Sequence, residues 1–350
     1  MYHTYLTIAI PAIVSFIATI ITTKFLMSYF KEAGIVAKDY NKSKPAVIPT
    51  SGGVALSFGI MVGILTYTFG GSFIFTPILN IPDLLAASLS IILIAFVGLI
   101  DDLNVKASEV ESTGRKDIRK GLKQWQKPLL TAIGALPLMA INAGISVVTI
   151  PFIGHVSLGI VYPIIILPLA VVFVANAFNL LGGFDGLQDG MAIVASLGFL
   201  LYFLAYGDNI AGANIGLLVS TLLLASLLAF LPFAKYKARI LPGDSFTYAV
   251  GAAFIVMMAM GSAESFGIII FLPWIIEFFL HLRKRFKVSD LGIVQKDGTF
   301  KAPYGKKIYS LTHLMMNIKP MKEWEVSLYL SVLEVFFVLL AFGLKFMSLL

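Results

Sequence analysis

Residues 83–100 read DLLAASLSIILIAFVGLI, an apolar run that stops at the carboxylate pair Asp101-Asp102. An α-helix needs a run of this length to cross a hydrocarbon layer about 30 Å thick. The run lacks the alternating polar face of a membrane β-strand, so it predicts a helical span. Because similar runs recur along the chain, the sequence predicts an all-α polytopic membrane protein.

The apolar runs divide the 350-residue chain into ten predicted membrane spans. Of all residues, 58% are hydrophobic and only 13% are charged, which is too little charge to cover a soluble surface. The mean hydropathy of +0.91 agrees with this interpretation. The predicted spans are 6–29, 52–70, 83–100, 128–144, 160–178, 190–206, 211–231, 246–262, 265–281 and 326–347.

Basic residues predict the orientation, because cytoplasmic loops retain Lys and Arg. All of them except Lys24 and Lys345 fall in the loops after the first, third, seventh and ninth spans. Both termini are therefore expected on the outer side of the plasma membrane. Residues 1–350 are expected to form a single membrane-embedded domain. The expected cytoplasmic loops are 31–51, 101–127, 179–189, 232–245 and 282–325, and Gly-punctuated runs around Gly292 and Gly298 indicate a small hairpin in the last one.

Composition also limits the classes of binding partner and of functional site that the protein can have. In a membrane protein, a net charge of +7 favours anionic lipid head groups and a phosphorylated substrate over nucleic acid, which is not expected. The absence of cysteine excludes disulfides, thiolate metal sites and cysteine nucleophiles. The function must therefore depend on other side chains.

Asp101, Asp102 and Asn104 form the first polar cluster at a span end. A single aspartate there could be a solvated helix end. Two adjacent carboxylates repel one another and raise the pKa of one of them, unless a cation or a role as a base offsets that cost. We therefore favour a functional interpretation of the pair.

The second cluster, residues 176–190, reads NAFNLLGGFDGLQDG. Asn176 and Asn179 are three residues apart, which places both amides on one helix face. Gly182, Gly183 and Gly186 allow a close approach of the backbone, whose amides can hold phosphate oxygens, while Asn and Asp oxygens can hold a hard cation. An ordinary glycine-rich loop is the alternative.

Two further clusters have open alternatives. Asp244 and Ser245, in the segment PGDSFTY, stand at the start of the predicted eighth helix and could be N-caps or site residues. The run Arg283-Lys284-Arg285 could be a stop-transfer flank or a diphosphate clamp. All four clusters are predicted at one membrane face, and together they supply the parts of a phosphoryl-transfer site.

These motifs resemble those of the polyprenyl-phosphate N-acetylhexosamine-1-phosphate transferases over nearly the whole chain. Phe96 to Asp102 resembles the family's signature before its second cytoplasmic loop, and Gln126-Lys127-Pro-Leu-Leu resembles the segment whose lysine opens the fourth helix. Residues 176–187 match the family pattern Asn-x-x-Asn-x-x-x-Gly-x-Asp/Asn-Gly. Pro242 to Tyr248 resembles the dolichyl-phosphate GlcNAc-1-phosphate transferases, which favours the eukaryotic-like, archaeal branch.

The resemblance implies roles for individual residues. Asn179 and Asp244 would bind Mg²⁺, with Mn²⁺ as an alternative. Asp101 or Asp102 would orient or deprotonate a lipid phosphate, and Lys127 would neutralise developing charge. The residues expected to bind substrate are Asn104, Asn176, Gly183, Asp185, Arg283, Lys284 and Arg285.

The implied activity is transfer of GlcNAc-1-phosphate from UDP-GlcNAc to a polyprenyl phosphate such as dolichyl phosphate, with release of UMP. This would be the first membrane step of glycoconjugate assembly, on the N-glycan route, with the active site facing the cytoplasm. Another UDP-N-acetylhexosamine as donor and a homodimeric state both remain open. A lipid or solute transporter is the alternative from another class, although transport sites usually lie near the bilayer midplane rather than at span ends.

Overall fold

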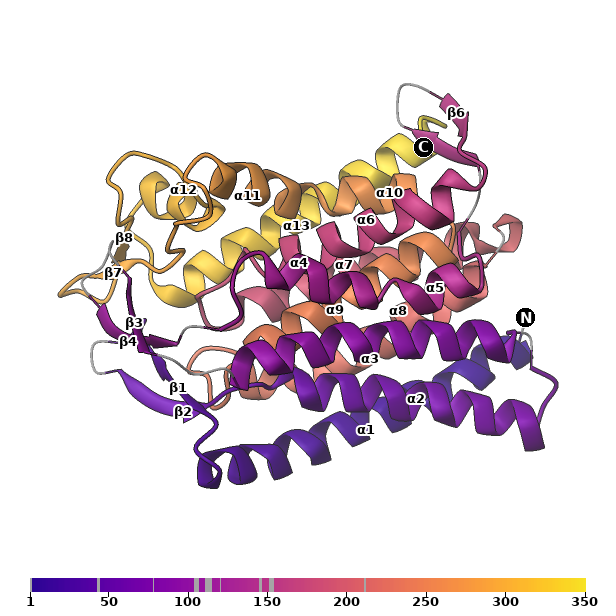
Figure 1. Ribbon diagram of the computed structural model, residues 1–350, viewed down its shortest axis with the longest axis horizontal. Helices are drawn as coiled ribbons and strands as arrows, with labels where there is room; N and C mark the ends of the chain where they lie inside the picture. Colours follow the sequence, from indigo (N-terminus) through magenta and orange to yellow (C-terminus); the bar gives the residue numbers. More distant parts are fainter. Residues whose placement is uncertain are drawn as a thin grey trace.

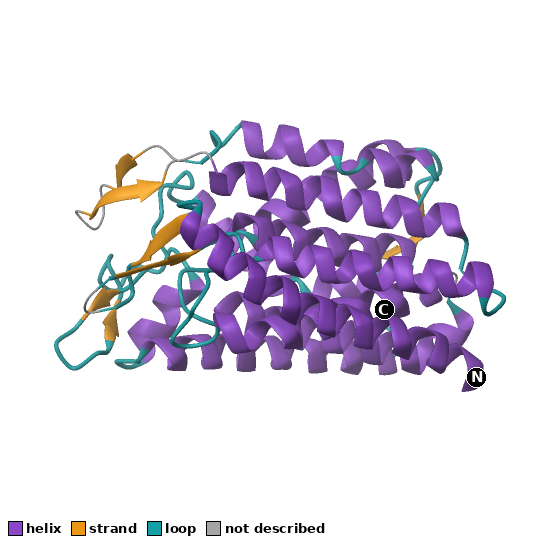
Figure 2. Ribbon diagram, turned by 90° about the horizontal axis from the view of Figure 1, so that it is seen from below, coloured by secondary structure: helices purple, strands orange, loops and turns teal. Residues whose placement is uncertain are grey.

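The computed structural model describes residues 2–350 except 43–44, 78, 104–106, 111–114, 120, 145–146, 151–153 and 211. The described chain is a bundle of long helices that run side by side, with short hairpins at its two ends (Figures 1 and 2). The helices are α1 (Tyr2–Glu32), α2 (Gly53–Phe73), α3 (Ile81–Leu103), α4 (Gln126–Ile133), α5 (Leu136–Ala140), α6 (Leu167–Phe178), α7 (Leu187–Tyr206), α8 (Ala213–Ala234), α9 (Gly243–Met260), α10 (Glu264–Ile270), α11 (Leu272–Leu282), α12 (Leu311–Ile318) and α13 (Glu323–Phe346). A π-helical turn, η1 (Tyr162–Ile166), precedes α6, and a 3-10 turn, η2 (Gly207–Asn209), follows α7.

The prediction of a helical, multi-pass membrane protein is confirmed. Within the described residues, α1, α2, α3, α7, α8, α9 and α13 are each long and apolar enough to cross a bilayer. The pair α10 and α11 counts as an eighth span if it is taken as one segment bent by 59°. Each of the ten predicted spans coincides with a helix or a broken helix, and the number of ten crossings stays a prediction.

Proline accounts for the breaks in the shorter helices. Pro273 lies in the first turn of α11 and lacks the N–H that would continue the hydrogen bonding of α10. The predicted span 128–144 is likewise divided into α4 and α5, and Pro137 lies in the first turn of α5. A run of apolar residues predicts a span but does not show where such a helix bends.

Four antiparallel hairpins occur in the described residues, and they distinguish the two ends of the bundle from one another. They are β1 (Val36–Asp39) with β2 (Ala46–Pro49), β3 (Ala107–Val110) with β4 (Arg115–Arg119), β5 (Val147–Ile150) with β6 (Gly154–Ser157), and β7 (Ile293–Val294) with β8 (Phe300–Lys301). The last one confirms the predicted hairpin. In Figure 1 the strands β1–β4, β7 and β8 lie at one end of the bundle, and both termini lie at the other.

Helix α9 is the centre of the bundle and positions the site. Every residue from Ser245 to Met260 is buried, because α2, α3, α6 and α8 pack around this helix. Its first turn lies against the backbone of two glycines: a Cβ on Gly98 of α3 would lie 2.4 Å from the Asp244 carbonyl oxygen, and one on Gly53 of α2 would lie 1.9 Å from the Phe246 nitrogen. Small residues at these contacts let the helices approach closely.

Candidate active site

The first turn of α9 is capped by a side chain from another helix. The backbone N–H groups of Asp244 and Ser245 donate to Asp102 Oδ1 and Oδ2 at 2.8 and 3.1 Å. These N–H groups have no partner within α9, and a carboxylate at this end also suits the helix dipole. The interpretation of Asp244 or Ser245 as an N-cap is wrong, since both follow Gly243, the first residue of α9, and Asp102 supplies the cap.

Asp101, Asp102, Lys127 and Asp244 form one group, called the Asp244 cluster here. Lys127, at the start of α4, forms ion pairs with Asp101 and, at 3.5 Å, with Asp244 Oδ2. The Asp101 side chain is 1% exposed and also accepts the Leu122 N–H, whereas the Asp244 side chain is 33% exposed. The structure thus brings together carboxylates and a lysine that are far apart in the sequence, and it leaves Asp244 open to a ligand.

The two asparagines of the second motif have different surroundings. Asn176 donates to Thr131 Oγ1 at 2.9 Å and accepts from Tyr248 Oη at 3.2 Å, so it joins α6 to α4 and α9. Asn179 accepts from Thr247 Oγ1 at 2.9 Å, and its side chain lies close enough to the Asp244 carboxylate to stabilise the charged form. The expected role of Asn176 in substrate binding stays a prediction, while Asn179 lies beside the exposed carboxylate.

A cavity of about 290 Å³ opens next to the Asp244 cluster. The loop before α9, the glycine-rich loop 180–186, the β1–β2 turn and the segment after α11 surround it. It is lined by Lys38, Asp39, Tyr40, Thr50, Asp102, Gly183, Phe184, Asp185, Gln188, Leu241, Pro242, Gly243, Asp244 and Leu291. Four residues predicted for the site, Asp102, Gly183, Asp185 and Asp244, therefore share one cavity.

Gly183 and Gly186 shape the loop as the sequence indicated. Their φ angles are +88° and +71°, values that favour glycine. A Cβ on Gly183 would lie 2.9 Å from Leu291 Cδ2, so the segment after α11 packs directly on this loop. This contact links the 282–325 loop to the cavity.

The side chains of Arg283 and Lys284 contact residues of their own loop. Arg283 donates to the Ile308 carbonyl at 3.2 Å, and the Lys284 ammonium lies 3.8 Å from the centre of the Tyr304 ring. Arg285 has a φ of +51° in the turn that follows α11. The expected diphosphate clamp stays a prediction, and Asn104 lies outside the described residues.

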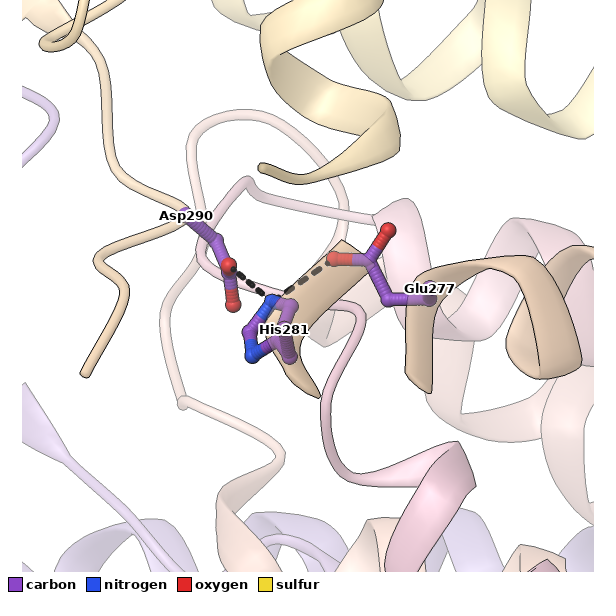
Figure 3. Close-up of side chains that lie close together, drawn as sticks. All are labelled: Glu277, His281 and Asp290. Carbon is purple, nitrogen blue, oxygen red and sulfur yellow. Dashed lines mark hydrogen bonds and ion pairs between the residues drawn. The ribbon is translucent and has the colours of Figure 1, made fainter. Parts of the chain in front are cut away.

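The same turn is closed by a buried cluster that sequence reasoning missed. His281 Nε2 lies 2.9 Å from both Glu277 Oε1 and Asp290 Oδ1, on either side of the imidazole ring (Figure 3). Glu277 Oε2 also accepts the Leu311 N–H at 2.7 Å, which connects α11 to α12. Burial raises the pKa of Asp290, and His281 opposes this shift. The i, i+4 spacing of Glu277 and His281 was the sequence signal for this contact.

Sequence reasoning also missed a second charged group, called the Lys42 cluster here: Asp39, Lys42, Asp185 and Glu323. Lys42 Nζ lies 2.8, 2.7 and 2.6 Å from carboxylate oxygens of Asp39, Asp185 and Glu323, respectively. Burial disfavours the charge on Lys42, but the three carboxylates outweigh burial and raise its pKa above the ordinary value. The closely spaced polar residues Asp39, Asn41 and Lys42 were the only local signal.

Comparison with known proteins defines the class. Residues 84–262 match the family described as Glycosyl transferase family 4. This segment covers just over half of the chain and contains the Asp244 cluster and the glycine-rich loop. The chain therefore belongs to glycosyl transferase family 4.

Two archaeal relatives align over almost their whole length. A protein of Saccharolobus solfataricus is 34% identical over 96% of both chains, and one of Sulfolobus acidocaldarius is 31% identical over 97% of both. Both are provisionally named UDP-N-acetylglucosamine–dolichyl-phosphate N-acetylglucosaminephosphotransferase. The phospho-N-acetylmuramoyl-pentapeptide-transferase of Clostridioides difficile is 27% identical over 61% of this chain and 60% of its own. The resemblance to hexosamine-1-phosphate transferases is confirmed.

Proposed function

We propose that this protein transfers N-acetylglucosamine-1-phosphate from UDP-GlcNAc to a polyprenyl phosphate of the dolichyl type and releases UMP. The observation that carries the proposal is the partly exposed Asp244 carboxylate, which lies beside Lys127 and Asn179 at a cavity that the glycine-rich loop also lines. The names of the two archaeal relatives support this donor and acceptor. The reaction would be the first membrane step in the assembly of a lipid-linked glycan, on the N-glycan route.

The geometry suits transfer between two phosphates. An oxygen of the lipid phosphate attacks the β-phosphorus of the donor, and the bond from this phosphorus to the bridging oxygen breaks as UMP leaves. Charge builds up on the phosphate oxygens during the transfer. Lys127 lies where it can offset that charge, and Asp102 holds the first turn of α9, and with it Asp244, in place. Both oxygens of Asp102 accept backbone N–H groups, and the buried Asp101 pairs with Lys127, so we assign to Asp101 the orientation of Lys127 towards the reacting phosphates.

The donor atoms at this site fit magnesium. Asp244 and Asn179 present carboxylate and amide oxygens, which are the ligands that a hard divalent cation prefers, and Asp244 lines the cavity. A bound magnesium ion would neutralise phosphate charge. Asp244 and Asn179 are therefore the proposed ligands.

The site belongs at the cytoplasmic face of the plasma membrane in this proposal. The hairpins β1–β4 and β7–β8, which carry many of the basic residues, lie at the end of the bundle that is opposite to both termini (Figure 1). Cytoplasmic loops retain such residues, and a soluble nucleotide sugar would reach the cavity from that side. The polyprenyl chain would remain in the lipid.

The test is UMP release by purified protein in detergent, supplied with UDP-GlcNAc and a polyprenyl phosphate. Magnesium should support turnover and EDTA should abolish it. Asp244→Asn should lower kcat by about 10²-fold or more, because it removes the carboxylate ligand of the metal ion that would offset the phosphate charge. Asp208→Asn, at an exposed residue between α7 and α8, is the matched control and should leave kcat unchanged.

Three outcomes would count against the proposal. Turnover that is unaffected by EDTA or by Asp244→Asn would remove the assigned metal site. Turnover with UDP-GalNAc but not with UDP-GlcNAc would support the transfer reaction and overturn the assignment of the donor sugar. If folded protein releases no UMP from either donor, the transferase proposal fails and transport becomes the better interpretation.

A further inference from the structure

The Lys42 cluster connects three distant parts of the chain. Lys42 follows β1, Asp185 belongs to the glycine-rich loop, and Glu323 is the first residue of α13. The side chains of Asp39, Asp185 and Glu323 are only 7%, 4% and 2% exposed. Buried carboxylates around one ammonium group hold their geometry firmly, because separating any of them from Lys42 leaves an unpaired charge out of water.

The glycine-rich loop is held by further bonds of the same region. Asn41 Nδ2 donates to the Gly183 carbonyl, and the Asp185 N–H donates to Glu323 Oε1 at 3.1 Å. Ser327 Oγ donates to the Asp185 carbonyl at 2.8 Å, so α13 contacts the loop through two residues. The backbone of residues 183–185 thus depends on side chains from the first hairpin and from the last helix.

The Lys42 cluster also separates two cavities. Asp185 lines the cavity of about 290 Å³ beside Asp244, whereas Lys42 and Glu323 line a second cavity of about 650 Å³. Asp39 lines both cavities. The ion pairs therefore form part of the wall that gives the smaller cavity its shape.

From these contacts we infer that Lys42 and Glu323 are positioning residues for the nucleotide-sugar donor. They hold Gly183 and Asp185 in the conformation that forms one wall of the smaller cavity, where the nucleotide sugar would bind. They take no part in the chemical step. This inference rests on the proposed function, because it assigns the cavity to the donor. It adds that the first cytoplasmic hairpin and α13 together determine how tightly the donor binds.

Steady-state kinetics with each substrate varied separately test this inference. Lys42→Met should raise the KM for UDP-GlcNAc about tenfold and should change kcat and the KM for the lipid phosphate less than about twofold. This pattern is expected because the variant weakens donor binding equally in the ground state and in the transition state. Lys42→Arg, which keeps the charge, should recover most of the donor affinity. Lys296→Met is the matched control, since Lys296 is an exposed lysine on the larger cavity.

A second variant covers the case in which Lys42→Met does not fold. Glu323→Gln keeps an oxygen for the Asp185 N–H but loses the charge opposite Lys42, and it should raise the donor KM about threefold. An unchanged donor KM in the folded variants, or an equal rise in the KM for both substrates, would overturn the inference. If the native protein has no turnover, the proposed function fails, and weaker UDP-GlcNAc binding by Lys42→Met in calorimetry would still support the positioning role. Equal binding by both proteins would overturn it.

Discussion

Two groups of carboxylates around a lysine lie at the same end of the helix bundle, and they differ in exposure. In the Asp244 cluster, the lysine pairs with one fully buried carboxylate and with Asp244, whose side chain is 33% exposed. In the Lys42 cluster no carboxylate side chain is more than 7% exposed. A charged side chain that remains partly exposed can bind a ligand, whereas charged side chains that are paired and buried fix the backbone around the ligand site.

Because of this difference, the largest loss of activity is expected from substitution of Lys127. Lys127→Met should lower kcat by about 10²- to 10³-fold, because a charge aimed at the transferring phosphate is lost. Turnover of UDP-GlcNAc at saturating concentrations of both substrates measures the effect. Lys123→Met, four residues earlier at an exposed position, is the control.

The comparison with Lys42→Met decides whether the two lysines act differently. The Lys127 variant should lose kcat, and the Lys42 variant should lose donor affinity. If both variants lose only donor affinity, the assignment of separate catalytic and positioning roles is wrong.

A smaller effect is expected from the backbone packing that holds Asp244. Gly98→Ala would place a methyl group 2.4 Å from the Asp244 carbonyl oxygen, and a backbone atom cannot move aside as a side chain can. We expect a loss of about 1–3 kcal/mol in stability, seen as a lower Tm in detergent, together with reduced kcat. Gly343→Ala in α13 is the control, since a Cβ there meets no atom within 4 Å. Equal Tm values for the two variants would show that α3 and α9 are not closely packed at this point.

The smallest effect is expected at Lys284, which faces an aromatic ring and not a carboxylate. Lys284 is partly buried and lies over the Tyr304 ring, a contact worth about 0.5–2 kcal/mol, so Lys284→Met should change the donor KM by less than about threefold. Lys287→Met, at an exposed neighbour, provides the reference. A tenfold rise would instead place Lys284 on the donor diphosphate and would add a third functional lysine to the two clusters.

The sequence predicted the helices well because each one depends on a local property. The length of an apolar run decides whether a helix can cross the bilayer, and seven uninterrupted helices agree with the predicted spans. The bend between α10 and α11 was missed, since the run is apolar on both sides of Pro273. The motifs singled out Asp102, Gly183, Asp185 and Asp244 one by one, and their spacing did not show that they line one cavity.

By itself, therefore, the sequence determined the class of protein, the positions of the helices and the residue types of the site. The tertiary structure decided what each charge does: Asp102 caps α9 across 142 residues of chain, and Lys42 pairs with Glu323 across 281. Hydrophobic periodicity and helix propensity act between near neighbours. A pairing between distant side chains exists only once the helices have packed, because packing brings their backbones to fixed positions and removes the water that would otherwise solvate each charge.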